Sequence, residues 1–423
     1  MRPFHRGACA EGAALSRRSF IRSSLGLSGL VALSAGVPRF LVRAAAAAEK
    51  AGPSSDRVLV VIQLAGGNDG VNTVIPFGHD AYYRTRPSIC VGADRVVRLG
   101  SDEIGLHPAL APMKSVFDAG RLAVVQGVGY PNPDRSHFRS MEIWETADPE
   151  NRFRRTGWLG RALPRTATGD ALQLGSREPA LALAAEGRSA TSLVSLESLA
   201  AKAGPGGGDP VREALAEALA AGGGAGSSDL EFLRESGRRA LDTEARLARA
   251  LESRAKAGDA GYPDFALASL LRDVAAVIAS GFPASIYYVS LGGFDTHARQ
   301  APQHELLLSE LAQSLAAFLR DVESKGQGER VLAITFSEFG RRLEENKSGG
   351  TDHGAAAPLF IASAGSALRG GIVGAHPSLD DLDDGDLKHH TDFRRVYATV
   401  LGRWLGLESA PILGAAHEPL PFV

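Results

Sequence analysis

Two short segments of the chain carry a carboxylate close to an imidazole, a combination that binds divalent metal ions. Asp295 and His297 are separated by one threonine, and Asp352 directly precedes His353 in a glycine-rich segment. On an extended or turning segment, residues two apart point to the same side, as two ligands of one metal require. The alternative for the first pair is that Asp295 caps a helix while His297 forms a hydrogen bond nearby. Because both pairs occur in one chain, we expect all four side chains to be metal ligands.

Two further carboxylates extend the predicted metal site. Glu338 follows the apolar residues 332–336, and a carboxylate buried there needs a cation or several hydrogen-bond donors to offset its desolvation. A salt bridge from Glu338 to Arg341 or Arg342 is the alternative. Asp69 lies in a Gly-Gly-Asn-Asp-Gly segment whose residue types are those of ordinary turns. Beside the other clusters, however, we predict that Asp69 is also a ligand.

A third kind of chemistry is concentrated in residues 134–139. This segment combines one hydroxyl, one imidazole and two guanidiniums, on Ser136, His137, Arg135 and Arg139. A serine held on a divalent metal becomes an alkoxide nucleophile, and an arginine binds two oxygens of a phosphate or sulfate group at once. We therefore predict these four residues as the catalytic group. Ser136 is alternatively the N-cap of the helix that follows, and the two roles do not exclude each other.

The apolar pattern predicts the elements that position these side chains. Short apolar runs of this kind fit strands buried on both faces of a parallel sheet, whose ligands bind at the carboxyl edge. The runs that end at or follow the polar clusters are residues 58–65, 286–291, 331–336 and 359–362, and another strand is expected at 122–128. Helices are expected at residues 108–119, 229–257, 263–280, 304–324 and 392–405. The alternation predicts an α/β fold, a doubly wound and mostly parallel sheet with helices on both faces.

Composition narrows the classes of partner and the domain organisation. The chain has 423 residues and a net charge of −2, and its basic residues are scattered, so no nucleic-acid partner is expected. Residues 57–423 are predicted to form the folded domain. Residues 164–228 drift into alanine, glycine and serine and are expected to form an insertion or cap.

The N-terminus has the pattern of an export signal. Arg17 and Arg18 form a twin-arginine pair, followed by a modestly apolar run and an alanine-rich stretch suited to cleavage. The apolar run is about 13 residues, whereas a membrane span needs roughly 20. We therefore expect residues 1–48 to be a signal peptide, the twin-arginine translocase to be a partner during export, and no stable membrane span to remain after cleavage. A periplasmic or secreted location follows.

Six ordered motifs in the chain resemble a known family. They are Leu64-Ala-Gly-Gly-Asn-Asp-Gly-Val-Asn, Leu106-His-Pro-Ala-Leu, Arg135-Ser-His-Phe, Gly293-Phe-Asp-Thr-His, Phe336-Ser-Glu-Phe-Gly-Arg and Thr351-Asp-His-Gly. On these motifs the chain resembles the bacterial exported family called domain of unknown function 1501. That family is similar to the alkaline phosphatase and sulfatase superfamily. The resemblance implies a doubly wound sheet with two metals at its carboxyl edge and a Ser, Thr or modified Cys nucleophile.

The resemblance also implies a role for each candidate residue. Asp69 matches the metal carboxylate after the first strand, Ser136 the nucleophile, Asp295 and His297 the later ligands, Glu338 the acid after the next strand, and His353, with Asp352 beside it, the histidine that ends the set. The chain departs from the superfamily at Phe339, where a ligand histidine is usual, which implies that one metal site is weakened or absent. Residues 131–135 have proline where a sulfatase carries its modified residue, so a formylglycine sulfatase is not implied.

Together these observations predict an exported metal-dependent hydrolase of phosphate or sulfate esters, acting on a small-molecule or polymer substrate. One or two divalent ions are expected. Mixed imidazole and carboxylate ligands favour Zn or Mn, while Mg or Ca would prefer oxygen ligands alone. The alternative is a non-catalytic extracytoplasmic binding or assembly protein on a degenerate metallohydrolase scaffold. His389 and His390 are an alternative ligand pair, although an exposed loop is the preferred interpretation for them.

Overall fold

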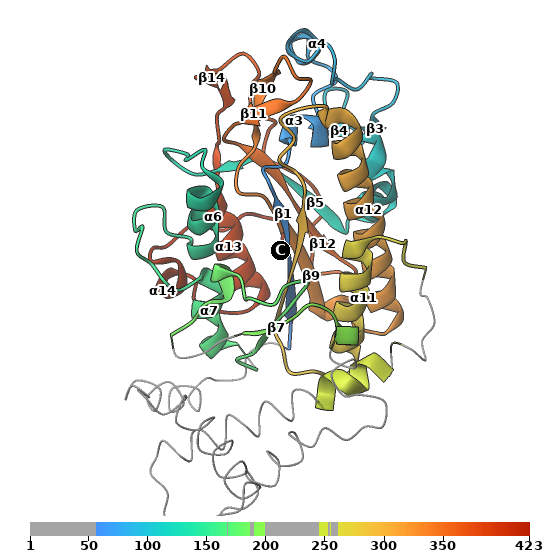
Figure 1. Ribbon diagram of the computed structural model, residues 1–423, viewed down its shortest axis with the longest axis vertical. Coiled ribbons are helices and arrows are strands. Elements are labelled where there is room, and N and C mark those ends of the chain that lie inside the picture. The colour runs from blue at the N-terminus through green and yellow to red at the C-terminus, as the bar shows by residue number, and fades with distance from the viewer. Residues whose placement is uncertain (1–55, 167, 187–189, 199–244, 253, 255–260) are drawn as a thin grey trace, which may run out of the picture. The chain divides into compact units, whose positions relative to one another are not determined.

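The computed structural model describes residues 56–166, 168–186, 190–198, 245–252, 254 and 261–423 (Figure 1). The described residues between 56 and 198 and between 246 and 423 group into one compact unit. The predicted signal peptide at residues 1–48 lies outside the described residues. So do residues 199–244, which include part of the predicted insertion and the start of the helix predicted at 229–257.

A sheet of nine described strands forms the centre of the fold, and its strand order is β13-β5-β12-β9-β1-β8-β6-β7, with β16 beside β5. The strands are β1 (Val58–Ala65), β5 (Leu122–Gly129), β6 (Ala171–Leu174), β7 (Thr191–Leu193), β8 (Ile286–Gly292), β9 (Val331–Phe336), β12 (Ala357–Ser363), β13 (Gly371–Val373) and β16 (Thr391–Asp392). β1 runs parallel to both of its neighbours, β8 and β9. The sheet is mostly parallel, which confirms the predicted fold class.

β12 is the exception, because it runs antiparallel to both β9 and β5. An antiparallel strand begins at the edge where its neighbours end. The residues just before β12 are therefore delivered to the same edge as the residues that follow β1, β5, β8 and β9. In this way the segment containing Asp352 and His353 reaches the carboxyl edge without a long return loop.

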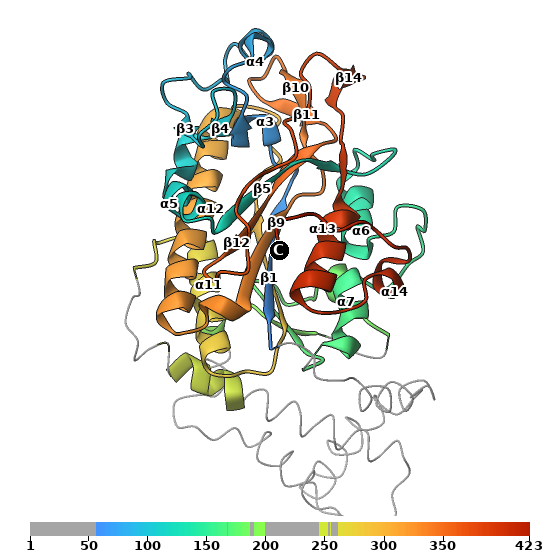
Figure 2. The same cartoon turned by 180° about the vertical axis from the view of Figure 1, so that it is seen from behind.

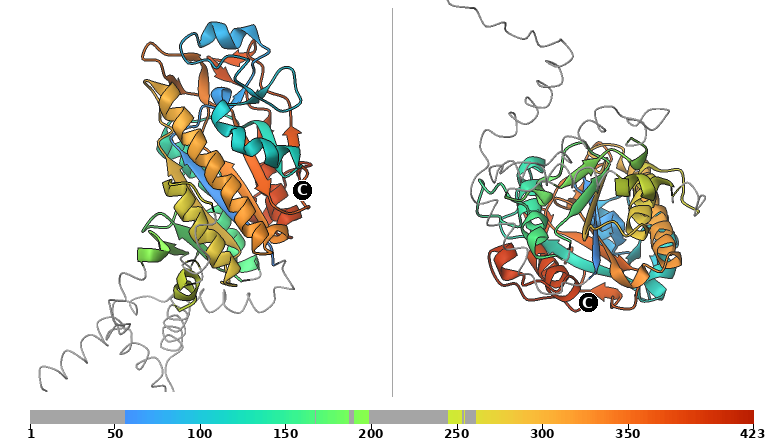
Figure 3. Two further views of the ribbon diagram at one scale, coloured as in Figure 1. Left: turned by 90° about the vertical axis from the view of Figure 1, so that its right-hand side faces the viewer. Right: turned by 90° about the horizontal axis from the view of Figure 1, so that it is seen from below.

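Alternating side chains of β1 divide the core between two faces of the sheet, as the two-residue period of a strand requires. Val60 and Ile62 pack on one face, where η1 (Pro108–Met113), α11 (Ala266–Ala279) and α12 (Gln300–Ser324) lie. Leu59 and Val61 pack on the other, where α6 (His137–Thr146), α7 (Trp158–Ala162) and α13 (Phe393–Thr399) lie. Figures 1 and 2 show α11 and α12 on one side of the sheet and α6, α7 and α13 on the other. In Figure 3, α11 and α12 lie side by side. Helices thus cover both faces, as predicted.

The short elements lie mainly at the carboxyl edge and in the connections. They are α3 (Gly70–Thr73), β2 (Val74–Ile75), α4 (Asp80–Thr85), β3 (Val97–Arg98), β4 (Gly105–Leu106), α5 (Lys114–Asp118), η2 (Leu163–Arg165), η3 (Leu181–Leu183), η4 (Gly328–Arg330), β10 (Arg341–Glu345), β11 (Thr351–His353), β14 (Leu382–Asp383), β15 (Asp386–Leu387), η5 (Val400–Trp404) and α14 (Ala410–Leu413). β10 pairs with β11, and β14 with β15. The closing helix predicted at residues 392–405 is α13 followed by a π-helical turn, η5.

One predicted boundary is wrong. Residues 164–228 were expected to form an insertion or cap, yet β6 and β7 come from this segment and pair with each other and with β8 in the central sheet. β6 is fully buried, so this part of the segment belongs to the core. Among the described residues, no helix has both the length and the apolar character needed to cross a bilayer.

Candidate metal centre

The carboxyl edge of the sheet gathers polar side chains from four connections. Asp295 follows β8, Glu338 follows β9, His137 begins α6 after the loop that leaves β5, and His353 ends β11 just before β12. One ligand atom each from His137, Asp295 and His353 lie within 4.8 Å of one another. Side chains more than 200 residues apart in sequence thus meet at one point.

Asp295 is held at this point by Arg341, whose side chain is fully buried. The guanidinium donates to Asp295 Oδ1 at 2.8 Å and to the carbonyls of Gly67 at 2.7 Å and Thr351 at 2.8 Å. Burial alone would raise the pKa of Asp295, but the hydrogen bond from Arg341 and the neighbouring imidazoles lower it to about 2. Asp295 is therefore a carboxylate at every ordinary pH. The sequence suggested Arg341 only as a partner for Glu338, and the structure gives it to Asp295.

All three imidazoles of the cluster use Nδ1 to contact an oxygen that accepts hydrogen bonds. His137 Nδ1 lies 2.9 Å from Glu338 Oε1, His297 Nδ1 lies 3.3 Å from Asp352 Oδ1, and His353 Nδ1 lies 2.8 Å from the Arg135 carbonyl oxygen. Because a carboxylate or carbonyl oxygen only accepts, these contacts favour the tautomer with the proton on Nδ1. Each neutral ring then has its lone pair on Nε2. This is the arrangement that orients histidines bound to metals.

The three Nε2 atoms converge on the Asp295 carboxylate. His297 Nε2 and His353 Nε2 lie 3.0 and 3.2 Å from Asp295 Oδ1, and His137 Nε2 lies 3.4 Å from Oδ2. The Nε2 atoms of His297 and His353 are only 2.9 Å apart. Two nitrogen atoms at this distance, beside a carboxylate, need either a proton or a metal cation between them, because two bare lone pairs would repel. Burial lowers the pKa of His353, which favours the neutral, metal-binding form of this ring. The donor set therefore fits a divalent metal ion.

Backbone geometry at the end of β1 lets the strands approach the cluster closely. Gly66 has a φ of +120°, and a Cβ atom at this position would lie 2.4 Å from the backbone nitrogen of Asp295. Only glycine tolerates both constraints. The Gly66 N–H donates to Glu338 Oε1 at 2.8 Å, so β1 also fixes the carboxylate that binds His137.

The structure changes the roles of three predicted residues. Glu338 and Asp352 were predicted as metal ligands, but they accept from the Nδ1 atoms of His137 and His297 and so lie behind the ligands. His137 was predicted as a catalytic residue, and its Nε2 joins the converging donor atoms instead. Of the other predicted ligands, Asp295 and His353 lie in the convergent group with His137, and His297 contacts Asp295 beside it.

The prediction that Asp69 is a metal ligand is wrong. Its side chain is fully buried, and Arg86 Nη1 lies 2.5 Å from Oδ2. Gln300 donates to the same oxygen, while Oδ1 accepts from the backbone of Val71 at 3.2 Å and caps α3. Both oxygens are therefore occupied by donors that belong to the fold. Asp69 organises the first turn after β1 and is not available to a metal.

The loop before α6 gives a mixed outcome for the predicted catalytic residues. Ser136 is at the N-cap position, yet its hydroxyl does not cap the helix, and the exposed side chain forms no hydrogen bond with the described residues. Arg135 is half-exposed and donates to Asp386 Oδ2 at 3.0 and 2.7 Å. The prediction that Arg139 binds the substrate is wrong, because its side chain is buried and donates to Glu142 Oε2 at 2.9 Å and to the Pro149 carbonyl oxygen at 2.6 Å.

Two other positions named from the sequence do not supply ligands. Phe339 packs its ring against His137 and His353, with centroids 4.9 and 4.5 Å away, and so forms a wall of the cluster. His390 bonds to the Ala375 carbonyl at 2.8 Å and lies outside the group of converging donors. The alternative pair formed by His389 and His390 is not part of this site.

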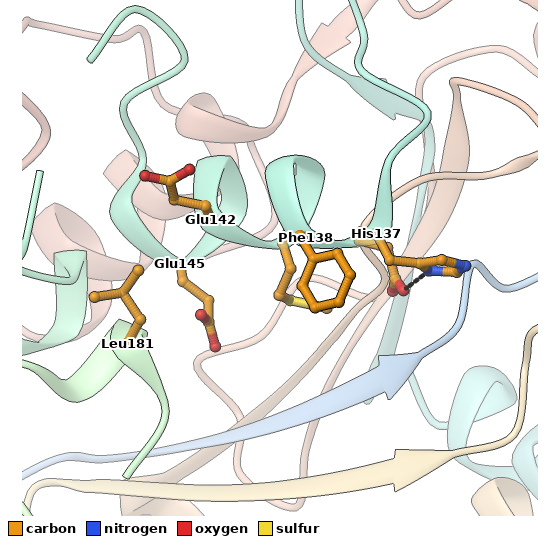
Figure 4. A pocket seen from close by; sticks show the side chains of 7 residues that line it. His137, Phe138, Glu142, Glu145 and Leu181 are labelled. Carbon is orange, nitrogen blue, oxygen red and sulfur yellow. Dashed lines mark hydrogen bonds and ion pairs between the residues drawn. The ribbon is translucent and has the colours of Figure 1, made fainter. Parts of the chain in front are cut away.

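A pocket of about 350 Å³ adjoins the cluster (Figure 4). Its lining residues are His137, Phe138, Met141, Glu142, Glu145, Leu181 and Glu338. Glu145 was not singled out from the sequence. Its position seven residues after Phe138 places both on one face of a helix, and this spacing was the signal that could have revealed it. Burial raises the pKa of Glu145 to about 7.

Comparison with known proteins places the chain in context. A family model described as "Protein of unknown function (DUF1501)" matches residues 102–414, which include five of the six motifs, and this confirms the predicted family. No curated protein matches the sequence.

Among solved structures, the chain is similar to the lipoteichoic acid synthase LtaP from Listeria monocytogenes, with 6% identity, a TM-score of 0.37, and coverage of 75% of this chain and 67% of that chain. It is similar to the PsFucS1 sulfatase from Pseudoalteromonas sp., with 11% identity, a TM-score of 0.34 and coverage of 89% and 72%. A protein in the alkaline phosphatase superfamily from Vibrio parahaemolyticus gives 10% identity, a TM-score of 0.31 and coverage of 76% and 68%. The likeness to these structures lies in the fold.

Proposed function

The chain belongs to the DUF1501 family, and from this premise we propose that it is a metal-dependent hydrolase of phosphate or sulfate esters. One observation carries the proposal: three imidazole Nε2 atoms and the Asp295 carboxylate converge, with two of the Nε2 atoms 2.9 Å apart. Such a set of atoms is held together by shared protons or by a metal cation, and a divalent ion satisfies all of them at once. It lies at the carboxyl edge of a mostly parallel sheet, where ligands of such folds bind.

The ligand chemistry favours Zn or Mn as the resident ion. His137, His353 and Asp295 form the closest group, and His297 lies at its more exposed side. Imidazole nitrogen suits Zn²⁺ and Mn²⁺, whereas Mg²⁺ and Ca²⁺ prefer oxygen ligands. Glu338, Asp352 and the Arg135 carbonyl would fix the three rings in their metal-binding tautomers. Phe339 supplies no ligand atom, which favours one well-formed metal position.

Ester hydrolysis requires a polarised ester oxygen, a nucleophile and a group that neutralises the anion. A bound divalent ion would supply the first of these by Lewis-acid polarisation. Ser136, with an exposed and unengaged hydroxyl directly before His137, is the proposed nucleophile, and a bound water is the alternative. Arg135 is bound by Asp386 and lies 3.5 Å from Asp384 through Nη1, and it would exchange the Asp384 contact for one to phosphate or sulfate oxygens.

The proposed location is the periplasm or the exterior, reached through the twin-arginine translocase. Arg17 and Arg18, followed by an apolar run too short to span a bilayer, support this. Expression of the full chain and N-terminal sequencing of the exported product test it. Cleavage near residue 48 is expected, and retention of the full-length chain in the cytoplasm would contradict it.

Elemental analysis of the exported protein, purified without chelator, tests the metal site. Near-stoichiometric Zn or Mn is expected in the wild type, and His353→Ala and Asp295→Asn should lose most of it. His390→Ala is the matched control, because His390 lies outside the cluster and should leave metal content unchanged. Equal metal content in all four proteins would refute the site.

A panel of chromogenic phosphate and sulfate esters, assayed with added Zn or Mn, tests the activity. Ser136→Ala should keep its metal and lose turnover. Stoichiometric metal without turnover of any ester would overturn the hydrolase proposal and favour a non-catalytic binding protein on the same scaffold.

A further inference from the structure

The pocket beside the metal centre is directly continuous with it. His137 and Glu338 line the pocket, and the same two side chains are bonded to each other within the cluster. His137 thus has one ring nitrogen in the converging donor group while its side chain forms part of the pocket wall. A single molecule can therefore place an anionic group on the cluster and extend its remaining part into the pocket.

The wall formed by α6 is shaped to contact a flat apolar body. Phe138, Met141 and Glu145 follow one another at spacings of three and four residues, so they share one face of the helix. Figure 4 shows Phe138 and Glu145 projecting from the same side of α6, with Leu181 beyond Glu145. The Phe138 side chain is 91% exposed. An isolated exposed aromatic residue is ordinary, but this ring borders a concave site next to candidate metal ligands.

The carboxyl groups that line the pocket indicate what kind of ligand it binds. Glu142 is paired with Arg139, and Glu338 with His137. Glu145 has no cationic partner among the described residues, and burial raises its pKa to about 7. The Tyr288 hydroxyl lies 2.9 Å from Gln63 Oε1 and 3.5 Å from Glu145 Oε1, so it donates chiefly to Gln63 and only weakly to Glu145.

A buried carboxyl group with a pKa of about 7 is partly protonated at neutral pH, and in that form it both donates and accepts a hydrogen bond, as a hydroxyl group does. A second anionic group would find no lysine or arginine among the residues that line the pocket, and burial disfavours the charged form of Glu145 that a quaternary ammonium would need. The polar chemistry of the pocket therefore matches an uncharged oxygen-bearing ligand.

We propose that this pocket binds the organic part of the ester, and that this part is an uncharged ring with its apolar face against Phe138 and Met141 and an oxygen near Glu145. The proposal rests on the proposed function, because it makes the pocket the alcohol side of a bipartite substrate site. It narrows the substrate class to esters of ring-shaped neutral alcohols. Esters of choline or of small aliphatic alcohols are disfavoured.

Binding of the alcohol alone tests the pocket without requiring turnover. Saturation-transfer NMR would be recorded with phenol and, separately, with choline as probes of the full-length exported protein. Phenol should bind the wild type, and Phe138→Ala should weaken its binding about fivefold to tenfold through loss of the ring contact. Phe153→Ala is the matched control, because Phe153 is also exposed, at 82%, but does not line the pocket. Stronger binding of choline than of phenol, or equal effects of the two alanine variants, would overturn the proposal.

Turnover of phenyl phosphate and methyl phosphate separates failure of the pocket from failure of the function. Phe138→Ala should lower kcat/KM for phenyl phosphate about tenfold more than it lowers kcat/KM for methyl phosphate. Turnover of both esters with no difference between Phe138→Ala and Phe153→Ala would refute the pocket and leave the hydrolase standing. Phenol binding that depends on Phe138 without any ester turnover would support the pocket and refute the hydrolase.

Discussion

The role of Asp69 can be tested by replacing it with asparagine, which keeps its size and its ability to cap α3 but removes its charge. Asp69 and Arg86 form an ion pair in which both side chains are fully buried. Removing one partner leaves the other as an uncompensated buried charge, which destabilises a protein by about 3–5 kcal/mol. We therefore expect Asp69→Asn to lose about 3–5 kcal/mol of unfolding free energy. Asp69→Ala, which also loses the cap, should lose about 1 kcal/mol more.

The pH dependence of the unfolding free energy provides a second test of the Asp69–Arg86 ion pair. Burial opposes ionisation of Asp69, but Arg86 outweighs burial and lowers its pKa below the ordinary value. A carboxylate with a lowered pKa in the folded state contributes stability that is present above its unfolded pKa, about 4, and is lost as the pH falls through the folded pKa. The wild type should therefore lose this contribution in acid, and Asp69→Asn should have no such contribution to lose.

Urea unfolding and metal analysis of the same preparations provide the assay. Asp69→Asn should unfold at lower urea while its folded fraction retains the metal content of the wild type. The double variant Asp69→Asn with Arg86→Met should recover part of the stability, because removing both charges eliminates the unpaired one. Loss of metal from Asp69→Asn with unchanged stability would refute this reasoning and restore Asp69 to the ligands.

Two further predictions concern carboxylates near the cluster. Burial raises the pKa of Glu145 to about 7, so the protonated side chain contributes stability that is fully present below about pH 4.5 and is lost as the pH rises through 7. The wild type should therefore lose about 2–3 kcal/mol of unfolding free energy between pH 5 and pH 8 that Glu145→Gln does not lose. Identical pH profiles of urea unfolding for the two proteins would contradict this. Glu338→Gln weakens the hydrogen-bond acceptor of His137 Nδ1 and should lower metal affinity about 10–100-fold in chelator competition. Glu142→Gln is the control, because the Glu142 carboxylate binds Arg139 and its loss should leave metal affinity unchanged. Equal affinities of the two variants would show that Glu338 does not orient His137.

The fold was largely predictable because its signals are local. The runs now seen as β1, β8 and β9 are apolar and buried, and burial on both faces leaves a parallel central sheet as the natural arrangement. Helical spacing predicted α11 and α12 within a few residues of their observed bounds. The segment containing β6 and β7 was assigned to an insertion because its short strands are surrounded by alanine, glycine and serine, and composition does not reveal pairing with a distant strand such as β8.

The members of the candidate metal centre were easier to predict from the sequence than their roles. Asp295, His297 and His353 were singled out because two carboxylate–imidazole pairs occur in one chain. Whether a carboxylate faces a metal, an arginine or a histidine depends on which distant side chain reaches it. In the structure, Asp69 pairs with Arg86, Glu338 with His137, and Asp295 with Arg341. The last two pairs join side chains from separate connections of the sheet.

The sequence by itself determined the class of fold, the edge of the sheet where chemistry gathers and most of the residue types present there, because strand burial and polar strand ends are written in local pattern. Tertiary structure alone decided the direction of β12, which brings His353 to that edge, and the hydrogen-bond partner of each Nδ1 atom. Those partners fix which ring nitrogen carries the proton, and hence which atoms are free to bind a metal. Such choices depend on distances between segments far apart in the chain, which no local pattern records.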